Sequence, residues 1–215
     1  MNESIIERVH KEKIIAIIRG CEPSICISLA KALYKGGITM IEVTFNQNDP
    51  QSFNKTTEAI QSIAKYFEGK VLVGAGTVLT KEQVNLAARA GAKYIISPNV
   101  NKDVIEYTKQ LGLVSMPGAF SASEICQAYE LGADFVKVFP VANLGSQYIK
   151  ALKAPLSHIP LLAVGGVNKD NIKDFLNAGA VGVGVGGKLV DKNLIEKKEF
   201  DKITSLAKEY ILNAK

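Results

Sequence analysis

Residues 134–140 read DFVKVFP, a nearly continuous apolar run with a single lysine, Lys137, at its centre. A Gly-Ala turn signal at residues 132–133 precedes the run, and Pro140 ends it. Short apolar runs with such limits are typical of strands that are buried on both faces, as the strands of a parallel sheet are. The segment therefore predicts a parallel strand that places Lys137 in the protein interior.

The surroundings of Lys137 follow from the alternation of side chains along a strand. Phe135, Lys137 and Phe139 share one face. An ammonium group is poorly solvated beside two aromatic rings, so the neutral amine is favoured, and a neutral lysine can attack a carbonyl carbon and form a Schiff base. The alternative is a lysine whose stem lies along the apolar wall while its ammonium group reaches water or pairs with a carboxylate.

Strand-like runs and helical segments alternate along the rest of the chain. Seven further strands are expected, at residues 14–18, 40–45, 71–73, 94–97, 114–116, 161–164 and 181–185. Helices are expected at residues 4–13, 23–35, 50–66, 81–90, 101–111, 121–131, 146–153, 170–178 and 196–212. Strict alternation predicts a parallel sheet with right-handed crossovers, and eight strands are the number that closes a barrel. We therefore expect an α/β fold, a single-domain (β/α)₈ TIM barrel over residues 1–215 with a short N-terminal helix.

The composition is that of a globular domain. Of 215 residues, 47% are hydrophobic and 22% are charged, which allows a substantial core. No apolar stretch is long enough to cross a bilayer, and residues 1–4 lack a secretory pattern. Three cysteines, at positions 21, 26 and 126, are odd in number and lack metal-type spacing, which fits a reducing compartment. We therefore expect a cytoplasmic protein without membrane partners.

The charge balance is basic, with a net charge of +5 and a pI of about 9.0. Such a balance favours anionic ligands or nucleic acid. The lysines are spread over helix faces and the C-terminal segment, however, without an arginine-rich run or a known nucleic-acid motif. We expect a small anionic substrate as the partner, and no nucleic acid.

Few polar residues are expected at the carboxyl ends of the strands, where barrels of this type carry their catalytic groups. They are Arg19, Glu42, Thr44, Thr77, Ser97 and Lys137. The only histidines, His10 and His158, are expected away from these ends. With no clustered acids either, the chain has few groups for a zinc site or a Ser-His-Asp triad, and we expect no metal and no cofactor.

Glu42 lies in the apolar segment 40–45 and, like Lys137, requires a partner if it is buried. Neighbouring cations would offset the desolvation of its carboxylate, and Lys137 and Arg19 are the candidates. In the functional interpretation, Glu42 transfers protons while Arg19 binds a substrate carboxylate with its forked guanidinium. In the alternative, Glu42 and Arg19 form an ion pair that only supports the structure.

Glycines mark three further strand ends. Residues 74–77 read GAGT, which would let the backbone approach a ligand, although most such segments only form a turn. Residues 163–168 read AVGGVN and residues 182–187 read GVGVGG. Barrels commonly bind phosphate after their last two strands, so this pair predicts a phosphate site. The match of residues 182–187 to a dinucleotide fingerprint is weak, because no further strand-helix-strand unit follows.

Five segments, in order and over nearly the whole chain, resemble the KDPG/KHG aldolase family: IEVT at 41–44, VGAGTVL at 73–79, ISPN at 96–99, MPG at 116–118 and VKVFP at 136–140. Three more are similar to the 2-keto-3-deoxy-6-phosphogalactonate aldolase branch of that family: IRG at 18–20, GSQYIKAL at 145–152 and AVGGV at 163–167.

The resemblance implies a metal-independent class I aldolase, usually a homotrimer, that reversibly cleaves a 2-keto-3-deoxy-6-phospho sugar acid to pyruvate and glyceraldehyde 3-phosphate. Lys137 matches the Schiff-base lysine and Glu42 the general acid and base. Thr77 matches a residue near the pyruvate carboxylate, Arg19 the carboxylate-binding arginine of the galactonate branch, and Gly166 the phosphate loop. Pro98, Gly165, Gly186 and Gly187 complete the expected substrate-binding set.

The chain departs from the family pattern at two places. The gluconate branch carries an arginine just beyond the glutamate motif, where this chain has FNQ at residues 45–47, so Arg19 would have to bind the carboxylate. The serine that usually helps to hold phosphate after the last strand is Gly187 here, followed by Lys188. Backbone N–H groups and Lys188 would then hold the phosphate.

Three alternatives remain open at the level of sequence. One is a 4-hydroxy-2-oxoglutarate aldolase that acts on an unphosphorylated substrate. Another is a different phosphate-binding barrel, such as an epimerase or a thiamine-phosphate-synthase-like protein, although those chemistries generally use metal ligands that this chain does not place at the strand ends. The third is a sugar-phosphate-binding barrel that has lost catalysis, because a fold alone does not specify activity.

Overall fold

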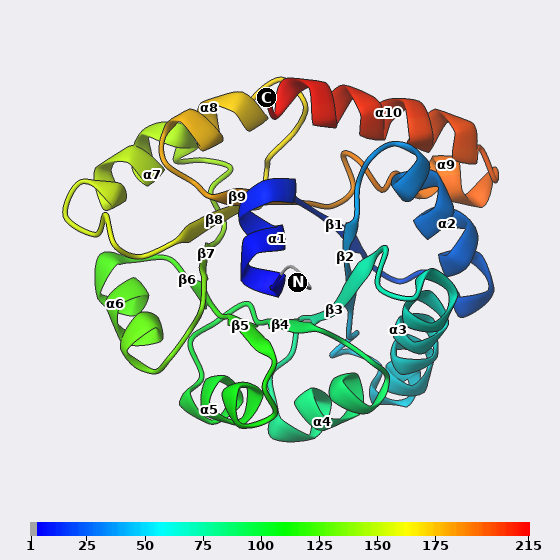
Figure 1. The fold of residues 1–215 in the computed structure, drawn as a ribbon, viewed down its shortest axis with the longest axis horizontal. Coiled ribbons are helices and arrows are strands. Elements are labelled where there is room, and N and C mark those ends of the chain that lie inside the picture. Colours follow the sequence, from blue (N-terminus) through cyan, green and yellow to red (C-terminus); the bar gives the residue numbers. More distant parts are fainter. Residues whose placement is uncertain (1–3) are drawn as a thin grey trace.

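The computed structural model describes residues 4–215 and has the α/β architecture expected from the sequence (Figure 1). The expectation about a secretory pattern falls mostly on residues 1–3, which lie outside the described residues. The strands are β1 (Ile14–Ile18), β2 (Met40–Thr44), β3 (Leu72–Gly76), β4 (Tyr94–Ile96), β5 (Val114–Met116), β6 (Gly118–Ala119), β7 (Val136–Val138), β8 (Leu161–Val164) and β9 (Gly182–Val185). They form one sheet in the order β5-β4-β3-β2-β1-β9-β8-β7-β6.

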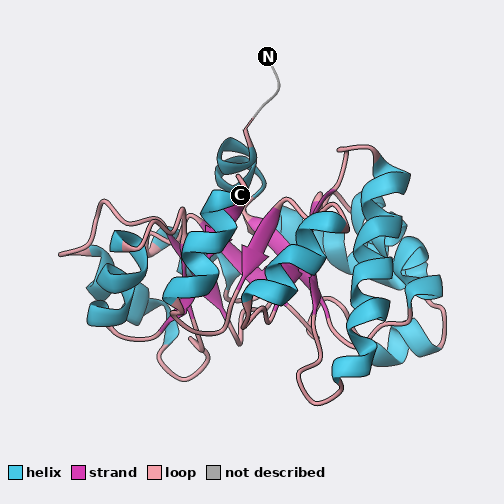
Figure 2. Ribbon diagram, turned by 90° about the horizontal axis from the view of Figure 1, so that it is seen from below, coloured by secondary structure: helices cyan, strands magenta, loops and turns pink. Residues whose placement is uncertain are grey.

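Helices form the outer layer around this sheet (Figure 1). They are α1 (Ile5–Glu12), α2 (Pro23–Lys35), the 3₁₀ turn η1 (Pro50–Ser52), α3 (Phe53–Phe67), α4 (Lys81–Arg89), α5 (Lys102–Gln110), α6 (Ala122–Glu130), α7 (Gly145–Lys153), α8 (Ile172–Asn177), α9 (Lys192–Glu196) and α10 (Phe200–Asn213). Of these, α1 lies at one end of the barrel rather than in the outer layer (Figure 2).

The barrel has eight strand positions, and the fifth is divided at Pro117. β5 pairs with β4, whereas β6 pairs with β7, all in parallel. Proline has no N–H group for a sheet ladder, which accounts for the interruption. The Lys137 N–H donates to the Pro117 carbonyl at 2.9 Å, and the Phe139 N–H donates to the Ala119 carbonyl at 3.0 Å. The two halves of the fifth strand therefore connect the ends of the sheet and complete the predicted (β/α)₈ barrel.

Two separate apolar cores follow from the alternation of side chains along the strands. The barrel interior is filled by Val9, Ile15, Met40, Leu72, Tyr94, Ile96, Val114, Met116, Phe135 and Leu162. A second and larger core lies between the sheet and the outer helices, and both Val136 and Val138 belong to it. Phe135 and Val136 thus lie on opposite faces of the sheet, as the alternation of side chains along a strand predicts.

Helix α1 covers the amino-terminal end of the barrel (Figures 1 and 2). The helix begins with a capping box, in which the Ser4 hydroxyl accepts from the Glu7 N–H and the Glu7 carboxylate accepts from the Ser4 N–H. Its one buried residue, Val9, packs into the barrel interior. The opposite end, where the strands finish, is left for a functional site.

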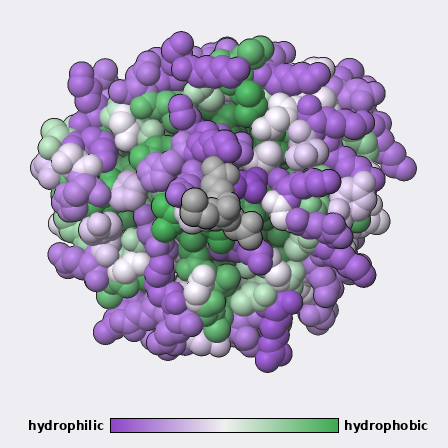
Figure 3. All heavy atoms as spheres, in the orientation of Figure 1, coloured by the Kyte–Doolittle hydropathy of each residue, from purple (hydrophilic) through white to green (hydrophobic). Residues whose placement is uncertain are grey.

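The face that carries α1 is mostly polar, with smaller apolar areas between the charged side chains (Figure 3). Within the described part of the chain, no helix is both long enough and apolar enough to cross a bilayer.

The prediction of a single final helix at residues 196–212 was wrong at its start. The structure has two helices there, because α9 ends at Glu196 and α10 begins at Phe200. Asp191 caps α9 by accepting from the Leu194 N–H at 3.1 Å. Residues 196–199 read EKKE and lack apolar periodicity, so neither the break nor the preceding short helix was visible in the pattern.

Candidate active site

A cavity of about 700 Å³ lies at the carboxyl ends of the strands. All nine site residues expected from the sequence line it: Arg19, Glu42, Thr77, Pro98, Lys137, Gly165, Gly166, Gly186 and Gly187. They come from β2 and β7 and from the segments that follow β1, β3, β4, β8 and β9. The fold therefore gathers these residues at one place.

Lys137 lies in the middle of β7 and points into the barrel. Its side chain is almost fully buried, with 7% of the residue exposed, and its Nζ lies 4.8 Å from the centre of the Phe139 ring. Burial lowers the pKa of the Lys137 amine from its ordinary value; the Glu42 carboxylate raises it by less and the Arg19 guanidinium lowers it further. A larger fraction of neutral amine, the form that attacks a carbonyl, is available than for a lysine in water.

Glu42 lies in β2, between β1 and β3, and only 2% of the residue is exposed. Burial raises the pKa of its carboxyl group, while the positive charges of Lys137 and Arg19 lower it by less. Among residues 4–215, no ion pair within 4.0 Å joins Glu42 to Arg19, so the purely supportive pair considered for the sequence is not formed. A carboxyl group with a raised pKa stays protonated to higher pH than one in water, so it can give a proton and, once ionised, take one back.

The glycines of β3 make room for buried side chains. A Cβ atom on Gly76 would lie 1.7 Å from Oε1 of Glu42, and one on Gly74 would lie 2.1 Å from the Tyr94 ring. The Tyr94 hydroxyl donates to the Ile41 carbonyl at 2.7 Å, directly before Glu42 in β2. The GAG segment thus sets the position of the Glu42 carboxylate.

A Gly76→Ala substitution tests this packing. Because the new methyl group would overlap the Glu42 carboxylate in a closely packed interior, we expect the free energy of unfolding in urea to fall by about 1–3 kcal/mol. Gly187→Ala is the control, since a Cβ there meets nothing within 4 Å, and its stability is expected to stay within about 0.5 kcal/mol of the parent protein. Equal stability of the Gly76 and Gly187 variants would show that Glu42 is not confined by β3.

Thr77, Arg19 and Pro98 lie on the cavity wall at the ends of β3, β1 and β4, respectively. Thr77 has a backbone φ of 56°, in the left-handed region that a β-branched residue rarely adopts. Strained backbone of this kind is concentrated at functional sites. The sequence indicated Thr77 as a site residue but gave no sign of this conformation.

Thr44 and Ser97, the remaining polar residues expected at strand ends, do not line the large cavity. Both are buried. Thr44 lines a separate cavity of about 210 Å³. The Ser97 N–H still donates to the Met116 carbonyl at 3.3 Å, so residue 97 continues the pairing of β4 with β5.

Two glycine pairs form the cavity wall after β8 and β9. Gly165 and Gly166 have φ values of 89° and 87°, and a Cβ on Gly166 would lie 2.5 Å from Ala142. Glycine is therefore required at both positions. Gly186 and Gly187 have open space around them, with nothing closer than 4.0 Å to an added Cβ.

The cavity wall also includes a segment that sequence reasoning overlooked. Lys188 was noted as a possible phosphate ligand, but Asp191, Lys192 and Asn193 were not considered, and all four line the cavity. They precede or begin α9, the helix that the apolar pattern did not reveal. The Asp191 carboxylate as N-cap was the signal that could have located them.

The two histidines do not line the cavity. His10 belongs to α1 and packs at 5.4 Å against the Phe135 ring, while His158 packs at 5.6 Å against Tyr129. In the chain from residue 4 onward, no group of three or more His, Cys, Asp or Glu side chains is placed to hold a metal ion.

Comparisons with known proteins show the family of this chain. A family model described as KDPG and KHG aldolase matches residues 5–206. The 2-dehydro-3-deoxy-6-phosphogalactonate aldolase of Escherichia coli K12 is 39% identical over 180 residues, which are 83% of this chain and 85% of that enzyme.

Solved structures extend the comparison. A native KDPGal structure is 35% identical, covers 93% of both chains and superposes with a TM-score of 0.83. The KDPG aldolase of Legionella pneumophila, captured with pyruvate as a covalent carbinolamine intermediate, is 27% identical over 97% of this chain and 98% of that one, with a TM-score of 0.85. The chain belongs to the KDPG and KHG aldolase family.

Proposed function

We propose that this protein is a class I aldolase that reversibly cleaves a 2-keto-3-deoxy-6-phospho sugar acid, of the gluconate or galactonate type, to pyruvate and glyceraldehyde 3-phosphate. One observation carries the proposal: a buried lysine with a lowered pKa and a buried carboxyl group with a raised pKa, Lys137 and Glu42, line the same cavity. Family membership supports the choice of substrate class.

In the first half of the reaction, Lys137 forms a bond to the substrate. Its neutral Nζ adds to the C2 ketone to give a carbinolamine, which loses water to form a cationic iminium. The carbinolamine hydroxyl leaves as water after it takes a proton from Glu42. The raised pKa of Glu42 keeps a protonated fraction of this carboxyl group available. The aromatic ring of Phe139, 4.8 Å from Nζ, limits the water around the amine.

In the second half, the carbon chain breaks. The Glu42 carboxylate removes the C4 hydroxyl proton, and the C3–C4 electron pair moves toward the iminium, releasing the aldehyde and leaving an enamine. The enamine takes a proton at C3 from the same carboxyl group, and water then hydrolyses the iminium to free pyruvate and Lys137. One group serves both transfers because its protonation alternates through the cycle.

The other residues of the cavity wall bind the two ends of the substrate in this proposal. Arg19, Thr77 and Pro98 surround the C1 carboxylate, with the Arg19 guanidinium supplying charge-assisted hydrogen bonds. The backbone of the two glycine pairs, Gly165-Gly166 and Gly186-Gly187, receives the phosphate, and Lys188 beside them supplies positive charge. No cofactor or metal ion takes part.

Trapping with pyruvate and borohydride tests the proposed function. Reduction converts the iminium into a stable secondary amine, and mass spectrometry of the digested protein is expected to locate the added mass on Lys137. An adduct on Lys150 or Lys153 instead, or no adduct at all, would leave the proposed reaction without its central step. Binding of the sugar phosphate without any adduct would favour a barrel that binds but does not react.

The need for phosphate distinguishes two substrate classes, and Lys188 gives the means to test it. With a phosphorylated six-carbon acid, Lys188→Met is expected to lower kcat/KM by about 10- to 100-fold, because a charge-assisted contact is lost. With the unphosphorylated acid and with 4-hydroxy-2-oxoglutarate, the change is expected to stay below about twofold. Lys197→Met, on an exposed lysine outside the cavity, is the control. A parent enzyme that is equally fast on unphosphorylated acids would instead favour the 4-hydroxy-2-oxoglutarate aldolase.

The assembly proposed for the enzyme is a homotrimer in the cytoplasm. Large apolar side chains exposed after β6 and before α7 support an interface, with Phe120 44% and Leu144 40% exposed. The Phe120 ring stacks on Tyr148 at 5.7 Å, which makes this area continuous with α7. Light scattering is expected to give three times the mass of the chain, and cell fractionation checks the location; a monomer mass would contradict the assembly.

A further inference from the structure

The backbone at Thr77 must be held in place by its surroundings. Its φ of 56° is sterically unfavourable for a β-branched residue. Such a conformation persists only where neighbouring groups determine it. Thr77 begins the loop from β3 to α4 and lines the cavity, so whatever fixes its backbone also fixes what the cavity presents to a ligand.

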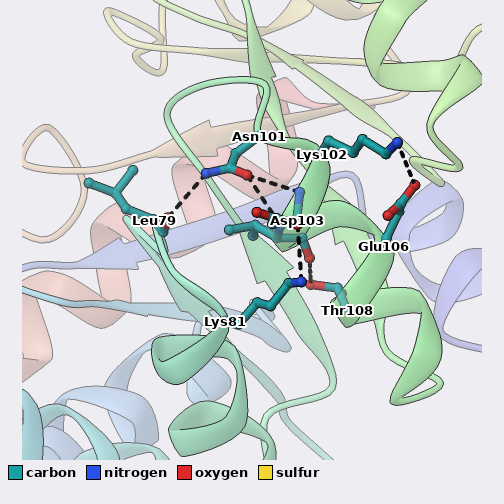
Figure 4. Close-up of polar contacts among 8 residues, drawn as sticks. Leu79, Lys81, Asn101, Lys102, Asp103, Glu106 and Thr108 are labelled. Carbon is teal, nitrogen blue, oxygen red and sulfur yellow. Dashed lines mark hydrogen bonds and ion pairs between the residues drawn. The ribbon is translucent and has the colours of Figure 1, made fainter.

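The far half of this loop is anchored by three hydrogen bonds. The Val78 N–H donates to the Ile96 carbonyl at 3.2 Å. The Asn101 side chain, which also caps α5, donates from Nδ2 to the Leu79 carbonyl at 3.3 Å (Figure 4). The Leu79 N–H donates to Oε1 of Gln83 at 2.7 Å. These contacts fix residues 78–79 but leave the Thr77 carbonyl to another partner.

That partner is Gln47, which is held in turn by Gln83. Gln47 donates from Nε2 to the Thr77 carbonyl at 2.6 Å, and its Oε1 accepts from Nε2 of Gln83 at 3.0 Å. Gln83 is 2% exposed, so its amide is shielded from water. Two side-chain amides thus connect the Leu79 N–H with the Thr77 carbonyl.

The orientation of both amides is dictated by the backbone at the two ends. Because the Leu79 N–H group is a donor, the Gln83 amide must point its oxygen toward Leu79. The Gln83 amide nitrogen then points toward Gln47. Gln47 must then present its oxygen to Gln83 and its nitrogen to the Thr77 carbonyl. The order of donors and acceptors is self-consistent and leaves one arrangement.

We infer that Gln47 and Gln83 are positioning residues that hold Thr77 in the left-handed conformation in which it meets the substrate carboxylate, an inference that rests on the proposed function. Neither glutamine is among the described residues that line the large cavity. They act on the ligand through Thr77, and their loss weakens binding of the keto acid while the reacting groups Lys137 and Glu42 stay in place.

The test measures the rate of borohydride trapping on Lys137 as a function of pyruvate concentration. For Gln47→Met, which keeps the length of the side chain but cannot donate, the half-saturating pyruvate concentration is expected to rise about tenfold, the effect of losing one hydrogen bond. The maximal trapping rate is expected to change by less than about twofold, because the chemistry is untouched. Gln51→Met, the same change at an exposed position of η1, is the control and is expected to match the parent.

Repeating the Gln47→Met substitution in a Thr77→Gly protein separates a positioning role of Gln47 from a general packing role. In Thr77→Gly the left-handed backbone is no longer strained, so adding Gln47→Met is expected to raise the half-saturating concentration by less than about twofold beyond the Thr77→Gly value. Gln83→Glu keeps the acceptor for the Leu79 N–H and removes the donor to Gln47, and it is expected to show part of the Gln47→Met effect.

The outcomes distinguish failure of the inference from failure of the proposed function. No adduct in the parent protein overturns the proposed function itself. A parent adduct together with an unchanged half-saturating concentration in Gln47→Met overturns only the positioning role. The same tenfold rise in the Thr77→Gly background, or a fall in maximal rate without a change in half-saturation, overturns it as well.

Discussion

Lys137→Met is expected to remove the trapped pyruvate adduct and to lower kcat/KM for cleavage by on the order of 10⁶-fold, the scale at which loss of a covalent nucleophile affects other enzymes. Methionine retains the length and apolar stem of lysine and suits a site that is 7% exposed beside Phe139. The protein is therefore expected to fold normally, and the measurement is steady-state cleavage combined with mass analysis after borohydride.

Lys150→Met provides the matched control for this prediction, since Lys150 is an exposed lysine of α7. It is expected to retain full activity and a full adduct. Residual cleavage in Lys137→Met above about one part in 10³ would show that the reaction does not require a covalent bond to this residue. An acid and base mechanism centred on Glu42 would then have to replace the Schiff base.

Glu42→Gln is expected to separate bond formation from bond cleavage. Losing the group that transfers protons lowers kcat for cleavage by about 10²- to 10⁴-fold. Lys137 keeps its neutral fraction, so the pyruvate adduct still forms on that residue, although more slowly. Steady-state cleavage and endpoint trapping, performed on the same preparation, measure the two effects.

The pH dependence of trapping gives a second measurement with a defined sign. The Glu42 carboxylate raises the pKa of Lys137, so removing its charge leaves burial and Arg19, both of which lower that pKa. The midpoint of the pH profile for trapping is expected to move to lower pH in Glu42→Gln and to stay unchanged in Glu58→Gln, on an exposed glutamate of α3. A shift to higher pH would mean that Glu42 does not act on Lys137 as a charge.

Much of the fold was predictable because strands and helices of this barrel differ in their apolar pattern. The run at 134–140 and the segments 14–18 and 161–164 are short, apolar and limited by turn residues, as buried parallel strands are. The S-x-x-E pattern at residues 121–124 is typical of a capping box, and that box is present at the start of α6. These signals depend only on residues that are close in sequence, so they can be recognised without knowledge of the tertiary structure.

The candidate site was predictable as a set of residues but not as an arrangement. Parallel strands bring their carboxyl ends together, so Arg19, Glu42 and Lys137 had to meet once the barrel was expected. That Gly76 makes room for Glu42, and that Gln47 bonds to Thr77, depends on contacts between elements far apart in sequence. No periodicity or composition along the chain encodes such contacts.

The closure of one end of the barrel by α1 determines the route by which the products leave. With α1 across one end and Tyr94, Met116 and Phe135 filling the interior, nothing can pass through the barrel. Both products of the proposed reaction must therefore use a single opening. The three-carbon acid is still attached to Lys137 when the aldehyde departs, so release is sequential, with pyruvate last, and in the synthetic direction pyruvate must enter first.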